Sequence, residues 1–229
     1  MKGAFSMGFC YFLLFKELAE GKVIQQSMDV FGEENGARDT MRLKARLLTA
    51  NQEEPCTKQS YTDNEIMLVF GIHCFSWKIV KLVWKTDGTE KKLIAFTAGT
   101  AAEQDTKVNF GLLLFPSDAP YKISQYCSFG FPALKESGQQ AEDGEVYGIA
   151  RAIQITQERE YPKIDIYYSN IVLKDWNDDD ADSLACRQCK TVMEDASQFV
   201  SAKLLPVSSA DTQFQIFVDQ ANWLAAQIK

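Results

Sequence analysis

Apolar and polar residues alternate at period two through much of residues 41–173, and this alternation restricts the fold more than any other feature. Residues 41–47 carry apolar side chains at every second position, with three basic side chains between them. Phe75, Trp77 and Ile79 alternate with polar neighbours in the same way. Such alternation is typical of strands that bury one face. It predicts a large antiparallel sheet over residues 41–173.

Two turns divide the predicted sheet. Asp87-Gly88 lies between β-prone segments and suits a type I′ hairpin, in which both central residues need positive φ. We therefore expect the strand before it to pair with residues 91–97. A second hairpin is predicted to run from residues 145–156 through a turn at 158–162. The resulting sheet is meander-like, and it is either open or closed into a barrel.

Residues 183–229 predict two amphipathic helices separated by Pro206. The first has apolar side chains at a spacing near 3.6, from Ala185 through Cys189 to Val200. The second has a similar stripe from Phe214 to Ile228. An antiparallel sheet with one apolar face needs a cover, and two striped helices supply it.

The first 20 residues are strongly apolar but too short to span a bilayer, which needs about 20 consecutive apolar residues. We expect a retained N-terminal helix. The alternative is a signal peptide cleaved near residues 19–21, which would make the protein secreted. The sequence thus predicts an α+β fold in one domain, residues 1–229, with a sheet packed by N- and C-terminal helices. We see no βαβ alternation and expect no parallel sheet.

Composition narrows the function classes. A net charge of −7 argues against a nucleic-acid partner, since phosphate contacts need clustered Lys and Arg. The basic residues Arg42, Lys44 and Arg46 are expected on the solvated face of a strand. Six cysteines in 229 residues are too few for a disulfide framework, so a cytoplasmic location is favoured.

Cys186 and Cys189 form the most suggestive local motif, because they fall in the first turn of a predicted helix. A helix N-terminus stabilises a thiolate, so these two cysteines are the candidate redox residues. The flanks lack the Trp, Gly and Pro of thioredoxin-like sites. Cys189 also lies on the apolar stripe, where a buried thiol is ordinary packing. Both interpretations stay open.

The remaining polar clusters give no metal or cofactor site. His73 is the single histidine, and its neighbour Cys74 would point to the opposite face of a strand. Residues 175–182 resemble the start of a calcium loop. However, the sixth position is not glycine, and the twelfth, Cys186, is not glutamate. No phosphate-binding glycine loop or nucleophile elbow occurs, so we predict no catalytic residues, no metal and no cofactor.

Aromatic residues are 12% of the chain, and many fall on predicted strands. On the concave face of a curved sheet they can line an apolar pocket. The candidate ligand-binding residues are Phe75, Trp77, Tyr147 and Tyr168. Core packing is the alternative interpretation, because aromatic residues are good strand formers.

Three functional hypotheses follow. The first is a non-enzymatic interaction or structural subunit that docks on a protein partner, or on itself, through apolar surface. The second is a binding protein for an apolar small molecule or lipid, with a cavity between the sheet and the C-terminal helix. The third is a thiol- or metal-dependent enzyme. The lack of a catalytic motif disfavours an enzyme, and the first hypothesis ranks highest.

Overall fold

The structure, a computed structural model, describes residues 6–86, 91–101, 108–119, 122–129, 141–169, 184–208 and 211–227. The chain divides into two compact units, residues 1–88 and residues 89–229. We call them unit 1 and unit 2, and each is described by itself. The prediction of one domain over residues 1–229 is not tested by this division and stays a prediction.

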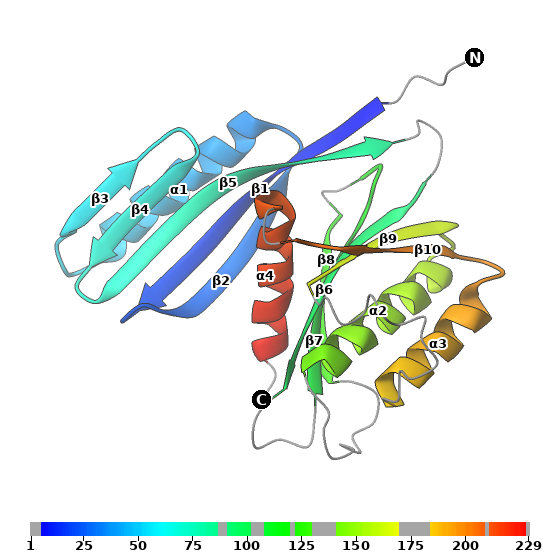
Figure 1. Cartoon of the computed structure of the whole chain (residues 1–229). Helices are drawn as coiled ribbons and strands as arrows, with labels where there is room; N and C mark the ends of the chain where they lie inside the picture. The colour runs from blue at the N-terminus through cyan, green and yellow to red at the C-terminus, as the bar shows by residue number, and fades with distance from the viewer. Residues whose placement is uncertain are drawn as a thin grey trace. The chain divides into compact units, whose positions relative to one another are not determined.

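Unit 1 is a five-stranded antiparallel sheet with one helix (Figure 1). Its strand order is β2-β1-β5-β4-β3. Its elements are β1 (Ser6–Ala19), β2 (Lys22–Phe31), α1 (Glu34–Asn51), β3 (Lys58–Tyr61), β4 (Glu65–Phe70) and β5 (His73–Thr86). Ala37, Met41 and Ala45 of α1 recur every four residues and are buried in one core with Leu13 and Trp77. This spacing explains why α1 lies flat on the sheet.

Unit 2 has a five-stranded mixed sheet with the strand order β10-β9-β6-β7-β8. Its strands are β6 (Leu93–Ala101), β7 (Val108–Pro116), β8 (Ser124–Phe129), β9 (Lys163–Tyr168) and β10 (Ser201–Pro206). Its helices are α2 (Ala141–Glu158), α3 (Leu184–Ala196) and α4 (Thr212–Ala226). β6, β7 and β8 pair antiparallel, whereas β9 runs parallel to both β6 and β10.

Helices cover both faces of the unit 2 sheet. Ala95 of β6 belongs to a core cluster that also contains residues of α2 and α3. The next residue, Phe96, instead packs against Phe214 and Phe217 of α4, and its ring centroid lies 6.0 and 4.8 Å from theirs. Successive residues of a strand point to opposite faces. α2 and α3 therefore pack on one face of the sheet and α4 on the other.

The predicted fold class is confirmed, since the chain is α+β with two mostly antiparallel sheets, which are not closed into a barrel. Several predicted elements are wrong. Residues 41–47, predicted as a strand, belong to α1, and residues 145–156 belong to α2. The first segment, Met-Arg-Leu-Lys-Ala-Arg-Leu, consists of strong helix formers, so its propensity and its alternation disagreed. The helix is the conformation that buries every fourth residue, Ala37, Met41 and Ala45, against the sheet.

The predicted N-terminal helix is also wrong, because residues 6–19 form β1. Its run of aromatic residues fits a pleated, buried surface better than a helix. β1 turns into β2 at Glu20 and Gly21, whose φ angles of 51° and 79° suit a two-residue hairpin turn.

The pairing around residues 87–88 also differs from the prediction. The turn itself lies outside the described residues. β5 pairs with β1 and β4, while β6 pairs with β7 and β9, so the expected hairpin is wrong. The two C-terminal helices are present as α3 and α4, but β10 lies between them in sequence and pairs parallel with β9. In the described part of the chain, no helix is both long and apolar enough to cross a membrane.

Candidate functional site

The ends of β6 and β9 in unit 2 form the first candidate site. From β6 the chain proceeds to β7 on one side, and later it returns to β9 on the other side, parallel to β6. In open sheets with parallel strands, ligands bind outside the carboxyl ends of the strands at such a switch point. We call the carboxyl end of β9, where Tyr168 pairs with Thr97 of β6, the β6–β9 edge.

A buried carboxylate lies at the β6–β9 edge. Glu145 of α2 is only 2% exposed, and its Oε1 accepts two hydrogen bonds from Ser169. The Ser169 backbone N–H donates over 2.8 Å and its hydroxyl over 3.1 Å. Ser169 directly follows β9 and is exposed. The pair therefore fixes the end of β9 to α2 and holds one hydroxyl at the surface.

Glycines bring α2 unusually close to β6. A β-carbon at Gly99 would lie 2.1 Å from the Ala141 carbonyl oxygen, and one at Gly148 would lie 2.0 Å from Thr97 Oγ1. Only residues without a β-carbon allow this approach. Because Gly144 and Gly148 are four residues apart, they occupy the same side of α2. Their contact with β6 holds the start of α2 beside the carboxyl end of that strand.

Two tyrosines next to this edge stay protonated well above neutral pH. Burial, together with the negative charge of Asp165, raises the pKa of Tyr167 to about 12. Burial and then the charge of Glu145 raise the pKa of Tyr168. Asp165 is itself paired with Lys92. At neutral pH both tyrosines are therefore uncharged, and Glu145 and Ser169 supply the polar chemistry of the edge.

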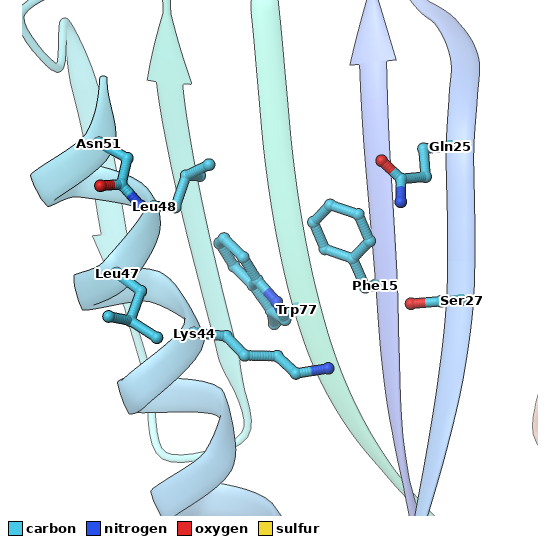
Figure 2. Close-up of a pocket in the computed structure, with 8 residues that line it drawn as sticks. All are labelled: Phe15, Gln25, Ser27, Lys44, Leu47, Leu48, Asn51 and Trp77. Carbon is cyan, nitrogen blue, oxygen red and sulfur yellow. The ribbon is translucent and has the colours of Figure 1, made fainter. Parts of the chain in front are cut away.

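Unit 1 contains the second candidate site, an open pocket of about 320 Å³ between α1 and the sheet (Figure 2). Two aromatic side chains, Phe15 of β1 and Trp77 of β5, lie on its sheet side. The other lining residues come from β2 and α1: Gln25, Ser27, Lys44, Leu47, Leu48 and Asn51. The pocket thus combines an aromatic wall, one cation and three uncharged polar side chains.

The four predicted ligand-binding residues lie in two separate cores. Phe75 and Trp77 are 6% and 3% exposed in the core of unit 1. Tyr147 and Tyr168 are 1% and 3% exposed in the core of unit 2. Trp77 also lines the pocket in unit 1. Ligand binding by these four residues stays a prediction.

The predicted redox pair lies on α3, as expected, with Cys186 half-buried and Cys189 buried. Burial, with a smaller contribution from Cys186, raises the pKa of the Cys189 thiol far above its usual range. A raised pKa disfavours the reactive thiolate. The redox role stays a prediction. The calcium-like segment, residues 175–182, lies outside the described residues.

Sequence reasoning missed Glu145 and Ser169. It placed residue 145 at the start of a strand, where an acidic side chain is ordinary. The available signal was the pair Gly144 and Gly148, because glycines four apart in an apolar segment indicate a helix face pressed against a neighbour. His73, which sequence analysis left without a role, lies 3.0 Å from a Glu17 oxygen in unit 1.

No family model matches the sequence, and no curated protein does. Solved structures match over 59% of this chain. They include RNase H1 from the halophilic archaeon Halobacterium salinarum, with a TM-score of 0.43, 12% identity and 96% of its own chain covered. The N-terminal RNase H domain of Rv2228c from Mycobacterium tuberculosis matches with a TM-score of 0.43, 8% identity and 91% covered. LC11-RNase H1, solved with an RNA/DNA hybrid, matches with a TM-score of 0.42, 8% identity and 94% of its own chain covered.

These neighbours contradict two expectations from the sequence. The similar structures are ribonucleases H, which contradicts the interpretation as a non-enzymatic subunit that docks on a protein partner. The expectation of no nucleic-acid partner is contradicted as well, since one of these structures contains an RNA/DNA hybrid. It rested on the net charge of the whole chain, all of which lies on residues 89–229. Residues 1–88 hold 11 basic and 11 acidic side chains, whereas residues 89–229 hold 13 basic and 20 acidic ones.

Proposed function

We propose that this chain acts on nucleic acid, and that unit 2 binds a nucleic-acid strand at the β6–β9 edge. The observation that carries the proposal is the exposed Ser169, which donates two hydrogen bonds to the buried Glu145 at the β6–β9 edge. Since the Ser169 N–H and hydroxyl both donate to Glu145, the hydroxyl oxygen is left to accept a hydrogen bond, for example from a sugar 2′-hydroxyl of RNA. The hydrogen bond to the buried Glu145 keeps the Ser169 hydroxyl in one orientation.

The ligand class to be tested comes from the names of the similar structures, one of which contains an RNA/DNA hybrid. The charge of unit 2 shapes how it would bind. The excess of acidic side chains in unit 2, 20 against 13 basic ones, disfavours the many Lys and Arg contacts of a non-specific binder. Each neutralised phosphate contributes about −0.9 to the slope of log affinity against log salt. We therefore expect a slope no steeper than about −2, since few phosphates are neutralised.

The described residues do not fit a two-metal hydrolytic site. Metal-dependent cleavage of a phosphodiester uses metal ions that clamp the attacking and leaving oxygens, each held by carboxylates. At the β6–β9 edge Glu145 supplies one carboxylate, and its Oε1 already accepts both bonds from Ser169. Within the described ranges no group of three His, Cys, Asp or Glu is placed to hold a metal. We therefore propose binding, and derive no hydrolytic step from these residues.

Fluorescence anisotropy tests the proposal directly. A labelled RNA/DNA hybrid, a single-stranded RNA and a DNA duplex are titrated with the full chain at two salt concentrations. We expect saturable binding of the hybrid, weakened about fivefold or more by Ser169→Trp, which fills the edge. Ser201→Trp is the matched control, because Ser201 is exposed at the start of β10 and pairs with Lys163, at the opposite end of β9. No hybrid binding, or equal weakening in both variants, would refute the proposal.

Two further assignments accompany this function. A cytoplasmic location rests on the cysteine density of the sequence, as before. Fractionation of cells that produce the tagged chain tests it. The single-domain organisation is tested by unfolding the full chain in denaturant, since one domain gives one cooperative transition.

A further inference from the structure

The pocket of unit 1 has a continuous aromatic and polar floor. Three neighbouring strands contribute it, since Ser27 of β2 pairs with Phe15 of β1, and Phe15 pairs with Trp77 of β5. The Phe15 and Trp77 rings are tilted by 40°, with centroids 5.2 Å apart. Trp77 is almost fully buried, whereas Phe15 is half-buried. Phe15 therefore offers the ring surface against which a planar group can pack.

Uncharged polar side chains surround this ring. Gln25 and Ser27 reach the pocket from β2, and Asn51 reaches it from the last turn of α1 (Figure 2). None of the three side chains has a hydrogen bond to another described residue. An amide offers both donors and an acceptor, and a hydroxyl offers one donor and accepts. These groups can form hydrogen bonds with the edge of a heterocyclic ring that carries both donor and acceptor atoms.

Lys44 adds a cation at the mouth of the pocket. Its Nζ lies 2.5 Å from Asp29 Oδ2, and both side chains are substantially exposed, at 40% and 43%. An exposed ion pair of this kind contributes only about 0.2–1 kcal/mol. A phosphate on a bound ligand can therefore replace Asp29 as the partner of Lys44 with little loss. The ring-binding groups and the phosphate-binding group are thus within one pocket.

We infer that this pocket binds one unstacked base of a single-stranded nucleic acid, together with its phosphate. A planar heterocycle packs on Phe15, its polar edge meets Gln25, Ser27 and Asn51, and the phosphate contacts Lys44. Single-stranded nucleic acids are recognised in this way, by aromatic stacking and by hydrogen bonds to splayed bases. A volume of about 320 Å³ lies at the lower end of the range for small-molecule sites, as expected for one nucleotide.

The inference rests on the proposed function in one respect only, namely that the bound base belongs to a nucleic-acid strand and not to a free nucleotide. A free nucleotide and a base within a strand share the same chemistry, so both are used as probes. The probes are the four ribonucleoside monophosphates and the oligonucleotides U8 and A8. Binding to the full chain is measured by calorimetry, and binding of the RNA/DNA hybrid is measured in parallel.

Two variants of α1 test the assignment. Lys44→Ala removes the phosphate contact, and we expect about tenfold weaker binding of the best monophosphate, as for loss of a charged hydrogen bond. Arg42→Ala is the matched control, because it removes an exposed cation of the same helix that does not line the pocket. We expect Arg42→Ala to leave the affinity unchanged. Phe15→Leu keeps an apolar side chain but removes the ring, and we expect a similar loss with retained folding.

The outcomes separate the two proposals. If no monophosphate and neither oligonucleotide binds, the pocket inference is overturned, whatever the hybrid does. Equal weakening by Lys44→Ala and Arg42→Ala also overturns it, because general charge then explains the binding. Monophosphate binding that depends on Lys44 supports the pocket even if the hybrid fails to bind, which would refute only the β6–β9 edge. Binding of U8 or A8 but not of monophosphates supports a strand as the source of the base.

Discussion

Gly99 of β6 lies so close to the first turn of α2 that a β-carbon on it would be 2.1 Å from the carbonyl oxygen of Ala141. Backbone atoms cannot rotate away as a flexible side chain can, so any larger residue here must push α2 off the sheet. Because α2 also carries Glu145, this contact positions the β6–β9 edge as well as stabilising unit 2.

We expect Gly99→Ala to reduce the free energy of unfolding by about 2–3 kcal/mol, in the upper range for overpacked cores. Gly32→Ala is the control, because a β-carbon at Gly32 meets nothing within 4 Å. Denaturant unfolding followed by circular dichroism measures both variants. An unchanged midpoint for Gly99→Ala would show that α2 does not approach β6 as described.

Ser169→Asp should create a cation site that the described residues do not form. The new carboxylate lies beside Glu145, and two neighbouring carboxylates repel each other unless a cation bridges them. We expect 10 mM Mg²⁺ to stabilise this variant by about 1 kcal/mol, as for a ligand several times above its dissociation constant.

The control for that experiment is Ser128→Asp, which makes the same change on an exposed position of β8. Thermal unfolding with and without Mg²⁺ is compared for both variants and for the unmodified chain. Equal stabilisation of all three by Mg²⁺ would contradict the placement of Ser169 next to Glu145.

Tyr167 should make stability depend on alkaline pH. Its pKa in the folded chain is raised from about 10 to about 12 by burial and by Asp165. The folded state therefore holds the proton more tightly than the unfolded chain. The stabilisation is fully present below pH 10 and is lost as the pH rises through 12.

Tyr167→Phe removes this titration, so the variant should lose less stability than the unmodified chain between pH 9 and pH 11. Urea unfolding at several pH values measures the difference. Tyr61→Phe in unit 1, where Tyr61 is 56% exposed, is the control and should follow the unmodified chain. A parallel decline of Tyr167→Phe and the unmodified chain would count against this contribution.

Thiol labelling tests the predicted redox pair. Cys127 is exposed, whereas Cys189 is buried and burial raises its pKa far above the usual range. Because the thiolate is the reactive form, iodoacetamide should modify Cys127 at least tenfold faster than Cys189 in the folded chain. Mass spectrometry of timed digests reads both rates, and urea-unfolded protein supplies the reference rate. Rapid modification of Cys189 would instead favour the redox interpretation.

The sequence predicted an α+β chain because its hydrophobic periodicities are local properties. The alternation around Phe75 and Trp77 and the apolar stripes of residues 183–229 were enough to place β5, α3 and α4. Residues 41–47 were wrong because only Met41 and Ala45 of the alternating set are buried, whereas Leu43 and Leu47 are exposed on the other side of α1. The partners of each strand were not predictable, since pairing depends on contacts between residues far apart in the chain.

The candidate sites depended on tertiary structure almost entirely. Trp77 was selected from the sequence as an aromatic strand residue, but only packing placed it beside Phe15 and Lys44. Glu145 and Ser169 are 24 residues apart and carry no local signal of their hydrogen bonds. The local pattern thus determined which segments form regular structure and how much apolar surface they bury. Folding alone decided that β6 and β9 run parallel, and therefore that β9 ends beside Thr97 of β6.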